Sequence, residues 1–515
     1  MTVDLFPIPR SSPIGQDPNV PTALPGPTPK TSQVLITILK DIHERWHCYF
    51  NRETGFHNHT SHHAIALWSL GANGVALQQA YARDSAYQLP MVKPPGEITE
   101  NNWKKHLGDD SYYKAYVDFF SRVVQERGPV AAVEDYVFSL DANFSQDGSA
   151  PHMLCRFMAM LFHSMIFVGY GLEYEIPGMV VEGLAQGAIH MDDSSALLSP
   201  AFFKQCFNDV GNVSLNPLST QPIVDPDAGR GASTKGIAQE KLASLVAHFS
   251  GMKQSTPRQS GNVHALSIIS RMLKDSKFEG IREMDVFEIL PTIMKKYSGA
   301  IRNYADQWSI GMRIGDPEHN EKELKAKLEE LAWAYTALYG LGGWTKGQHF
   351  NADFFLAHIV TSASFLPSIA KKLEVPSQVL LLRSHFAVAL AWWVGRGRPG
   401  FDIAGLSATM NEVSDMPSNP WLPIIQSAIA HEEDHVPKLQ RTFVYWSQLY
   451  GHKGPNDAVL SSTELPDADK IDGTLFIKVA KMTSDRVSSK APLPGHENEP
   501  AVFYVWDRSG FYSSA

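Results

Sequence analysis

Cysteine is scarce in this chain of 515 residues, which contains only Cys48, Cys155 and Cys206. Three cysteines cannot build a disulfide framework, and no two of them have the C-x-x-C spacing of a zinc or redox site. The first 30 residues also lack the basic stretch and the apolar stretch of a secretory signal. The sequence therefore indicates a reducing compartment, and we expect a cytoplasmic protein.

Charged residues are also few, at 19% of the chain, and positive charge is in the minority. The 45 lysines and arginines face 54 aspartates and glutamates, which gives a formal net charge of -9. No large cationic face is available to neutralise a phosphate backbone, so we expect no nucleic-acid partner. The most apolar stretch, 157–174, is interrupted by His163 and Tyr170 and is too short to span a bilayer, so we expect no membrane partner either.

Period-two alternation of apolar residues, the mark of half-buried strands, is nearly absent. Apolar residues instead recur at helical spacing, as Leu35, Ile38, Leu39 and Ile42 do. We therefore predict an all-α fold, a multi-helix single-domain bundle. The predicted helices cover residues 33–50, 60–82, 110–126, 153–174, 178–190, 241–249, 321–341, 352–370, 379–394 and 423–450.

Composition divides the chain into three parts. Residues 1–32 are rich in proline and predict an extended lead-in. Residues 33–460 form the predicted helical catalytic domain, and the polar residues 461–515 are expected to wrap around it. Within the domain, the Pro-, Gly- and Ser-containing residues 193–236 predict a long irregular insertion, either a joint or a lid.

Histidine is concentrated near the N-terminus, where His57, His59, His62 and His63 fall within seven positions. If a helix begins with Asn58 as its cap, His59 and His63 lie one turn apart on one face, and two such imidazoles can bind one metal ion. His62 would then be the reserve ligand. The alternative is a polar helix start with solvated imidazoles.

Three more histidines, His163, His358 and His385, each interrupt a strongly apolar helical segment. A buried imidazole needs partners for both of its nitrogens, and a metal ion together with a hydrogen-bond acceptor would supply them. The alternative is a core histidine with two ordinary hydrogen bonds. Because helix bundles build metal sites from such inward-facing side chains, we predict one buried metal centre. Its predicted ligands are His59, His63, His163, His358 and His385.

Two further patterns match known motifs. Residues 431–435 read His-Glu-Glu-Asp-His, the H-E-x-x-H pattern of zinc hydrolases, but Pro437 requires a helix start or break close by. Residues 395–400 match the G-x-G-x-x-G dinucleotide fingerprint, yet they follow a predicted helix rather than a strand, so we interpret them as a helix end. A zinc metallohydrolase and a non-catalytic helical binding protein with satisfied core histidines stay open as alternatives.

The sequence blocks that carry a family resemblance are Asn58-His59-Thr60-Ser61-His62-His63, His163 with Gly169-Tyr170-Gly171-Leu172-Glu173, residues 353–362, Arg396-Gly397-Arg398-Pro399, residues 430–438 and Asp472-Gly473-Thr474-Leu475-Phe476. In this order, over residues 45–480, they resemble the fungal questin oxidase-like family. Two positions depart from it: Phe167 stands where the family often has a second histidine, and His385 stands where relatives commonly have lysine.

The resemblance implies an O2-dependent oxygenase that cleaves a ring or a C–C bond of an aromatic polyketide in fungal secondary metabolism. Members have been described as non-haem iron dioxygenases and as Baeyer-Villiger-type oxidases, some of which use NADPH. The resemblance favours Fe(II) over zinc as the cofactor, with O2 as co-substrate and a small aromatic molecule as substrate. It also makes residues 431–435 a structural feature of the family. NADPH rests on the resemblance alone, because the chain has no flavin or nicotinamide fingerprint of its own.

Overall fold

The computed structural model describes residues 3–10, 23–145, 148–208, 210, 262–409, 418–489 and 503–512. The predicted helix over 241–249 lies outside the described residues. So does most of the predicted insertion, from residue 211 onward. The described start of that insertion is not wholly irregular, because it contains a helix over Pro200–Asn208.

The regular elements of the described residues are helices except for two short strands, which confirms the all-α fold class. Their one sheet is a two-stranded antiparallel hairpin. The elements up to the middle of the chain are α1 (Pro29–Arg45), β1 (Tyr49–Asn51), β2 (Phe56–His57), α2 (Thr60–Ser69), α3 (Gly74–Asp84), η1 (Ser85–Tyr87), η2 (Trp103–His106), η3 (Asp110–Tyr112), α4 (Tyr113–Arg127), α5 (Pro129–Val133), η4 (Glu134–Phe138), α6 (Met153–Glu173), α7 (Pro177–Ile189) and α8 (Pro200–Asn208).

The second half repeats the pattern of helices joined by short connections. Its elements are α10 (Ala265–Leu273), η5 (Ser276–Phe278), α11 (Ile289–Ala305), α12 (Pro317–Thr336), η6 (Ala337–Leu341), α13 (Phe354–Ala363), α14 (Leu366–Ala370), α15 (Val375–Gly395), α16 (Ile403–Thr409), α17 (Trp421–Ala430), α18 (His435–Tyr450), α19 (Ala458–Ser461), η8 (Ala468–Lys470) and α20 (Thr474–Ser488).

Helix α1 shows how local sequence sets an element. Thr28 caps it in a capping box with Thr31, and Pro29 occupies the first turn, where a missing N–H costs nothing. The helix therefore begins inside the segment predicted to be an extended lead-in. Its apolar stripe, which includes Leu35 and Ile42, is buried as the periodicity predicted.

Helix α6 is interrupted in its middle. Met160, Leu161 and Phe162 have φ values of 50°, 58° and 65°, in the left-handed region that costs a non-glycine residue about 1–2 kcal/mol each. The interruption comes directly before His163. It changes the direction in which the second half of α6 presents its side chains.

By length and composition, α6 and α15 could each cross a membrane, which corrects the expectation that the apolar stretch is too short. Both helices are buried inside the protein, over 89% and 94% of their most apolar windows. This burial is typical of core helices. One continuous cluster of buried apolar side chains surrounds them.

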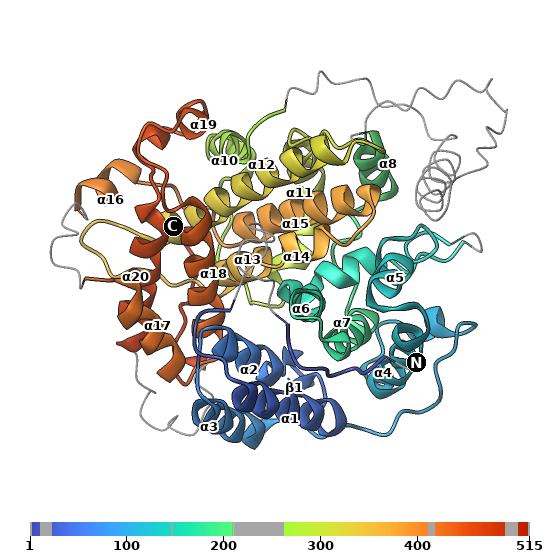
Figure 1. The fold of residues 1–515 in the computed structure, drawn as a ribbon. Coiled ribbons are helices and arrows are strands. Elements are labelled where there is room, and N and C mark those ends of the chain that lie inside the picture. The colour runs from blue at the N-terminus through green and yellow to red at the C-terminus, as the bar shows by residue number, and fades with distance from the viewer. Residues whose placement is uncertain are drawn as a thin grey trace, which may run out of the picture.

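Four helices position the site described below. Helix α2 packs on α6 and α18, and α13 packs on α6 and α18, so the four enclose one region near the centre of the molecule (Figure 1). Because these helices are far apart in sequence, the site is made of segments from both ends of the chain.

The described C-terminal residues 503–512, here called the C-terminal strap, lie across the start of α13. Asp507 forms a parallel bridge with Asp353: its N–H donates to the Ala352 carbonyl at 3.0 Å and its carbonyl accepts from the Phe354 N–H at 2.9 Å. The Arg486 guanidinium of α20 donates to the Asp507 carboxylate at 2.6 Å. The strap is thus held by main-chain and side-chain bonds.

Candidate metal centre

Four buried histidines meet where these helices enclose the centre of the molecule. His59 is the N-cap of α2, His163 follows the interruption in α6, His358 lies in α13, and His435 is the first residue of α18. Three of the four were predicted as metal ligands; His435 was not.

The four imidazoles form two pairs that face each other through Nε2. The Nε2 atoms of His59 and His163 are 2.6 Å apart, and those of His358 and His435 are 3.1 Å apart. The two pairs are in contact, because the ring centroids of His163 and His358 are separated by 5.2 Å and those of His59 and His435 by 4.5 Å.

The other ring nitrogen of each histidine in the first pair is held by an acceptor. His59 Nδ1 lies 2.9 Å from the Asp434 carboxylate, and His163 Nδ1 bonds the Met160 carbonyl, which the interruption in α6 turns toward it. A carboxylate and a carbonyl can only accept, so each Nδ1 carries the proton. Each Nε2 atom then has no proton and presents a lone pair.

In the second pair, His358 and His435, each Nδ1 also lies beside an acceptor. His358 Nδ1 donates to the Phe354 carbonyl at 2.7 Å, one helical turn earlier. His435 Nδ1 lies 2.5 Å from the Glu433 carboxylate and 3.3 Å from that of Asp434. The neutral tautomer therefore again leaves both Nε2 atoms without a proton.

The two Nε2 lone pairs that face each other in each pair repel. Moving a proton from Nδ1 to Nε2 in one ring does not help, because its Nδ1 lone pair would then face a carbonyl or carboxylate oxygen. A cation between the rings, or an added proton, would remove the repulsion. Burial opposes an added proton: it lowers the pKa of His59 to about 3 and that of His163 and His358 well below the ordinary value. For His435, burial lowers the pKa, but the Asp434 and Glu433 carboxylates outweigh it and raise the pKa above the ordinary value.

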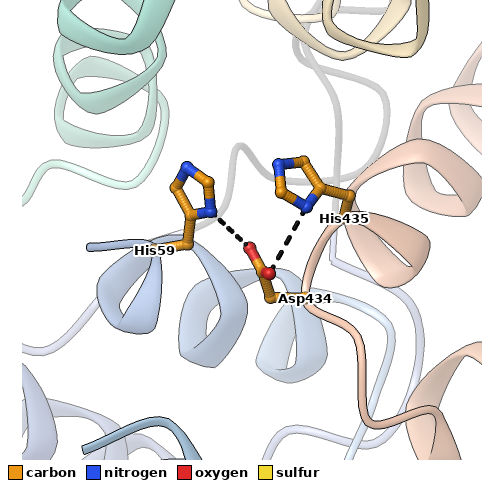
Figure 2. Close-up of side chains that lie close together, drawn as sticks. All are labelled: His59, Asp434 and His435. Atoms are coloured by element: carbon orange, nitrogen blue, oxygen red, sulfur yellow. Dashed lines mark ion pairs between the residues drawn. The ribbon is translucent and has the colours of Figure 1, made fainter. Parts of the chain in front are cut away.

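Asp434 lies between His59 and His435, and its carboxylate faces the Nδ1 atom of each (Figure 2). Ligand atoms of these three buried residues lie within 4.8 Å of one another. Burial acts to raise the pKa of Asp434, but His435, Lys438 and His59 together hold it well below its usual range. Two imidazoles and one ionised carboxylate are the donor set of the facial triad in non-haem Fe(II) oxygenases. In this structure, however, Asp434 faces the Nδ1 atoms of His59 and His435, which carry protons, so the triad would require both protons to leave. The residues therefore fit a ferrous ion best through the four Nε2 atoms, with Asp434 holding two of the rings.

His63 was predicted to share a metal with His59, but the imidazoles that pack on His59 are those of His62, His163 and His435. His59 has the non-helical backbone of an N-cap, φ −101° and ψ 4°, and its carbonyl accepts the first helical hydrogen bond, from the His63 N–H at 2.9 Å. His63 Nδ1 instead pairs with the Asp84 carboxylate at 2.7 Å. The Nε2 atom of His63 is buried and has no partner among the described residues, so His63 stays a predicted ligand.

His385 also stands apart from the four histidines. Tyr335 Oη bonds its Nδ1 and Ser362 Oγ bonds its Nε2, both at 2.9 Å. Both hydroxyls can donate or accept, so one neutral tautomer satisfies His385 without a metal. This is the hydrogen-bonded core histidine that the sequence left open as the alternative.

His62 has no hydrogen-bond partner on either nitrogen among the described residues, although it is fully buried. Its ring centroid is 4.0 Å from that of Phe167 and 5.8 Å from that of His59. It borders the centre but does not face a second imidazole nitrogen as the four histidines do.

A further histidine pair was not predicted. The Nε2 atoms of His57 and His190 are 2.8 Å apart, and the His57 ring stacks on His163 with centroids 4.1 Å apart. His190 donates through Nδ1 to the Arg156 carbonyl, so an Nε2 proton on His57 satisfies this pair without a cation. His57 belonged to the predicted cluster, but nothing in the sequence links it to His190.

Residues 431–435 and 395–400, which match the zinc hydrolase and dinucleotide motifs, do not have the structures that those motifs require. Helix α17 ends at Ala430 and α18 begins at His435, so His431 and His435 do not share a helical face, as the zinc hydrolase motif requires. The described part of residues 423–450 is thus two helices and not one. Gly395 is the last residue of α15, which confirms that the residues matching the dinucleotide fingerprint are a helix end.

The sequence profile of the questin oxidase-like family matches residues 56–443. The chain belongs to this family. The match includes all four histidines, Glu433 and Asp434 but ends before the C-terminal strap. Members of the questin oxidase-like family are oxidoreductases, so membership supports an enzymatic role for this chain.

Curated relatives agree with the family assignment. The chain is 30% identical to the Baeyer-Villiger monooxygenase AacuH of Aspergillus aculeatus over 468 residues, which cover 88% of this chain and 85% of that protein. It is 30% identical to the Baeyer-Villiger oxidase AgnL3 of Paecilomyces divaricatus, over 73% of this chain and 71% of the relative. The questin oxidase of Aspergillus terreus is 27% identical over 33% of this chain and 36% of its own.

Proposed function

We propose that this questin oxidase-like oxidoreductase is an O2-dependent oxygenase with a ferrous ion at the centre formed by His59, His163, His358, His435 and Asp434. The proposal depends on one observation, the two buried pairs of imidazoles. In each pair, both Nδ1 protons are donated to other acceptors, so the two facing Nε2 atoms repel each other as long as all rings are neutral. A divalent cation resolves both conflicts at once. Satisfied core histidines, such as His385, show no such conflict.

When bound, a ferrous ion would supply the one-electron chemistry toward O2 that no side chain of the site provides. The residues around the ion orient its ligands and exclude water. Glu433 and Asp434 fix the rotation and tautomer of His435, and Asp434 does the same for His59. Met160 and Phe354 do so through carbonyl groups. Phe354 also packs its ring on His358 and His435, which excludes water from that side.

The proposed substrate is an aromatic polyketide or a related metabolite, and the proposed reaction is oxidative cleavage of a ring or C–C bond. The names of the relatives support this reaction, because a Baeyer-Villiger oxidation inserts one oxygen atom between a carbonyl carbon and its neighbour, so that the C–C bond breaks and two C–O bonds replace it. The second oxygen atom of O2 leaves as water and requires two electrons and two protons. NADPH is the proposed reductant on the family resemblance alone, and the proposed compartment is the cytoplasm.

Metal analysis of protein purified without oxygen tests the proposal. We expect about one iron per chain, loss of O2 uptake after chelation, and its recovery after reloading with Fe(II) but not with zinc. Zinc in the isolated protein together with hydrolytic activity would support the hydrolase alternative. A chain that binds no metal and still binds aromatic ligands would be the helical binding protein.

A further inference from the structure

The C-terminal strap places Trp506 beside the candidate metal centre. Its ring centroid is 6.2 Å from that of His435 at an interplanar angle of 76°, and Trp506 is 3% exposed. The family profile ends at residue 443, so this contact comes from a part of the chain outside the match.

The position of Trp506 is fixed from both sides. The preceding described strap residues include Phe503, which packs on Phe56 of β2. On the other side, Asp507 is bonded to α13 and to Arg486, and the guanidinium of Arg508 lies 4.1 Å above the Phe354 ring. The strap thus spans the segments that carry His57, His358 and His435.

The indole Nε1 of Trp506 is buried and has no hydrogen-bond partner among the described residues. Two other buried tryptophans of the described chain have partners, Trp68 with Ser32 at 3.1 Å and Trp308 with Glu330 at 2.9 Å. The Nε1 atoms of Trp392 and Trp393 also have none among the described residues, but neither ring packs on a histidine of the centre. An unpaired buried donor lowers stability unless a ligand accepts its proton. Here that donor belongs to a ring that touches a proposed metal ligand.

We propose that Trp506 is a substrate-positioning residue, whose indole N–H donates a hydrogen bond to a carbonyl or phenolic oxygen of the aromatic substrate beside His435. This rests on the proposed function, because the substrate class comes from there. An indole N–H can donate but not accept, so it selects an oxygen with a free lone pair. The indole face also covers the His435 side of the centre and keeps water from it.

The test measures binding of alizarin, a coloured dihydroxyanthraquinone, to iron-loaded protein under anaerobic conditions. Trp506→Phe keeps an aromatic ring and removes the N–H, so we expect the dissociation constant to rise about fivefold to tenfold with iron content unchanged. Trp393→Phe is the matched control. Its Nε1 is equally buried and without a partner among the described residues, but its ring packs on Phe401 of the loop after α15. We expect no change in the control.

Replacing Trp506 by benzothienylalanine changes only the N–H to sulfur, so it gives the same test if the phenylalanine variant does not fold. Equal alizarin affinity for the wild type and this variant, or an equal loss in Trp393→Phe, would overturn the role of Trp506. A wild-type protein that holds no iron would instead overturn the proposed function, so the two failures are separable.

Discussion

The His163 imidazole lies among three others, stacked on His57 and His59 with nearly parallel rings and tilted against His358. Its pKa falls well below the ordinary value, first through burial and then through the neighbouring His59. A neutral imidazole keeps its lone pair available, which is the form that binds a metal. At the scale of single residues, His163 is therefore ready to bind a cation and not a proton, whereas His435 is the one of the four whose pKa is raised.

Replacing His163 by alanine should remove most of the bound iron, because it deletes one of the converging Nε2 atoms. His385→Ala is the control. It deletes an equally buried imidazole whose nitrogens are occupied by Tyr335 and Ser362, so iron content should stay close to wild type while stability falls. Iron per chain by mass spectrometry checks both. Loss of iron in both variants would support the ligand set predicted from sequence, which contains His163 and His385, over the one proposed here.

This contrast shows the limit of residue-level prediction. His163 and His385 are both single imidazoles in apolar helices, and the sequence gives no sign of which one is satisfied. The partners of His385 lie 50 and 23 positions away along the chain, and they become visible only in the fold. Three of the four facing histidines could be named because they interrupt apolar helices or belong to the N-terminal cluster.

At the scale of elements, two irregularities shape the centre: the left-handed residues inside α6 and the break between α17 and α18. Met160, Leu161 and Phe162 are ordinary helix formers, so no local signal predicts that they leave the helix. The break was signalled in part, because Pro437 is tolerated only in the first turn of α18. The spacing of apolar residues predicted the helices well. It predicted the interruptions of the helices poorly, because tertiary contacts determine where a helix is interrupted.

A pair of substitutions at Met160 tests the α6 interruption. With φ at 50°, isoleucine is strongly disfavoured because its branched Cβ crowds the backbone, whereas asparagine tolerates this region. We expect Met160→Ile to lower the free energy of unfolding by about 1 kcal/mol or more relative to Met160→Asn, and to release iron faster to a chelator. Denaturant unfolding of both variants gives the comparison. In a regular buried helix the order would be reversed, because isoleucine would gain from burial.

At the scale of the whole molecule, burial also perturbs groups outside the centre. Asp193, half-buried after α7, has its pKa raised to about 7 by burial and then by the Asp192 carboxylate. Asp192 itself pairs with His152 at 2.7 Å. Because the folded protein holds a proton on Asp193 that the unfolded chain releases near pH 4, this group lowers stability increasingly as pH rises from about 4 to about 7.

Asp193→Asn removes this titration. We expect the variant to gain on the order of 1–2 kcal/mol more in unfolding free energy at pH 8 than at pH 5, a figure reduced because the residue is half-buried. Urea unfolding at both pH values measures it. Asp192→Asn should change the unfolding free energy at pH 8 in the opposite direction and lower it, since it removes the partner of His152. A gain for Asp193→Asn that is equal at both pH values would show an unperturbed carboxyl.

The four facing histidines come from positions 59, 163, 358 and 435, and no two belong to the same helix. The chain therefore contains no local fragment that can hold the proposed ion. During synthesis, His59 leaves the ribosome long before His435, and the C-terminal strap that covers His435 follows last. If the proposed ion is bound, it would be acquired by an already folded chain, and a cell short of iron would then accumulate intact apoprotein that can still be activated.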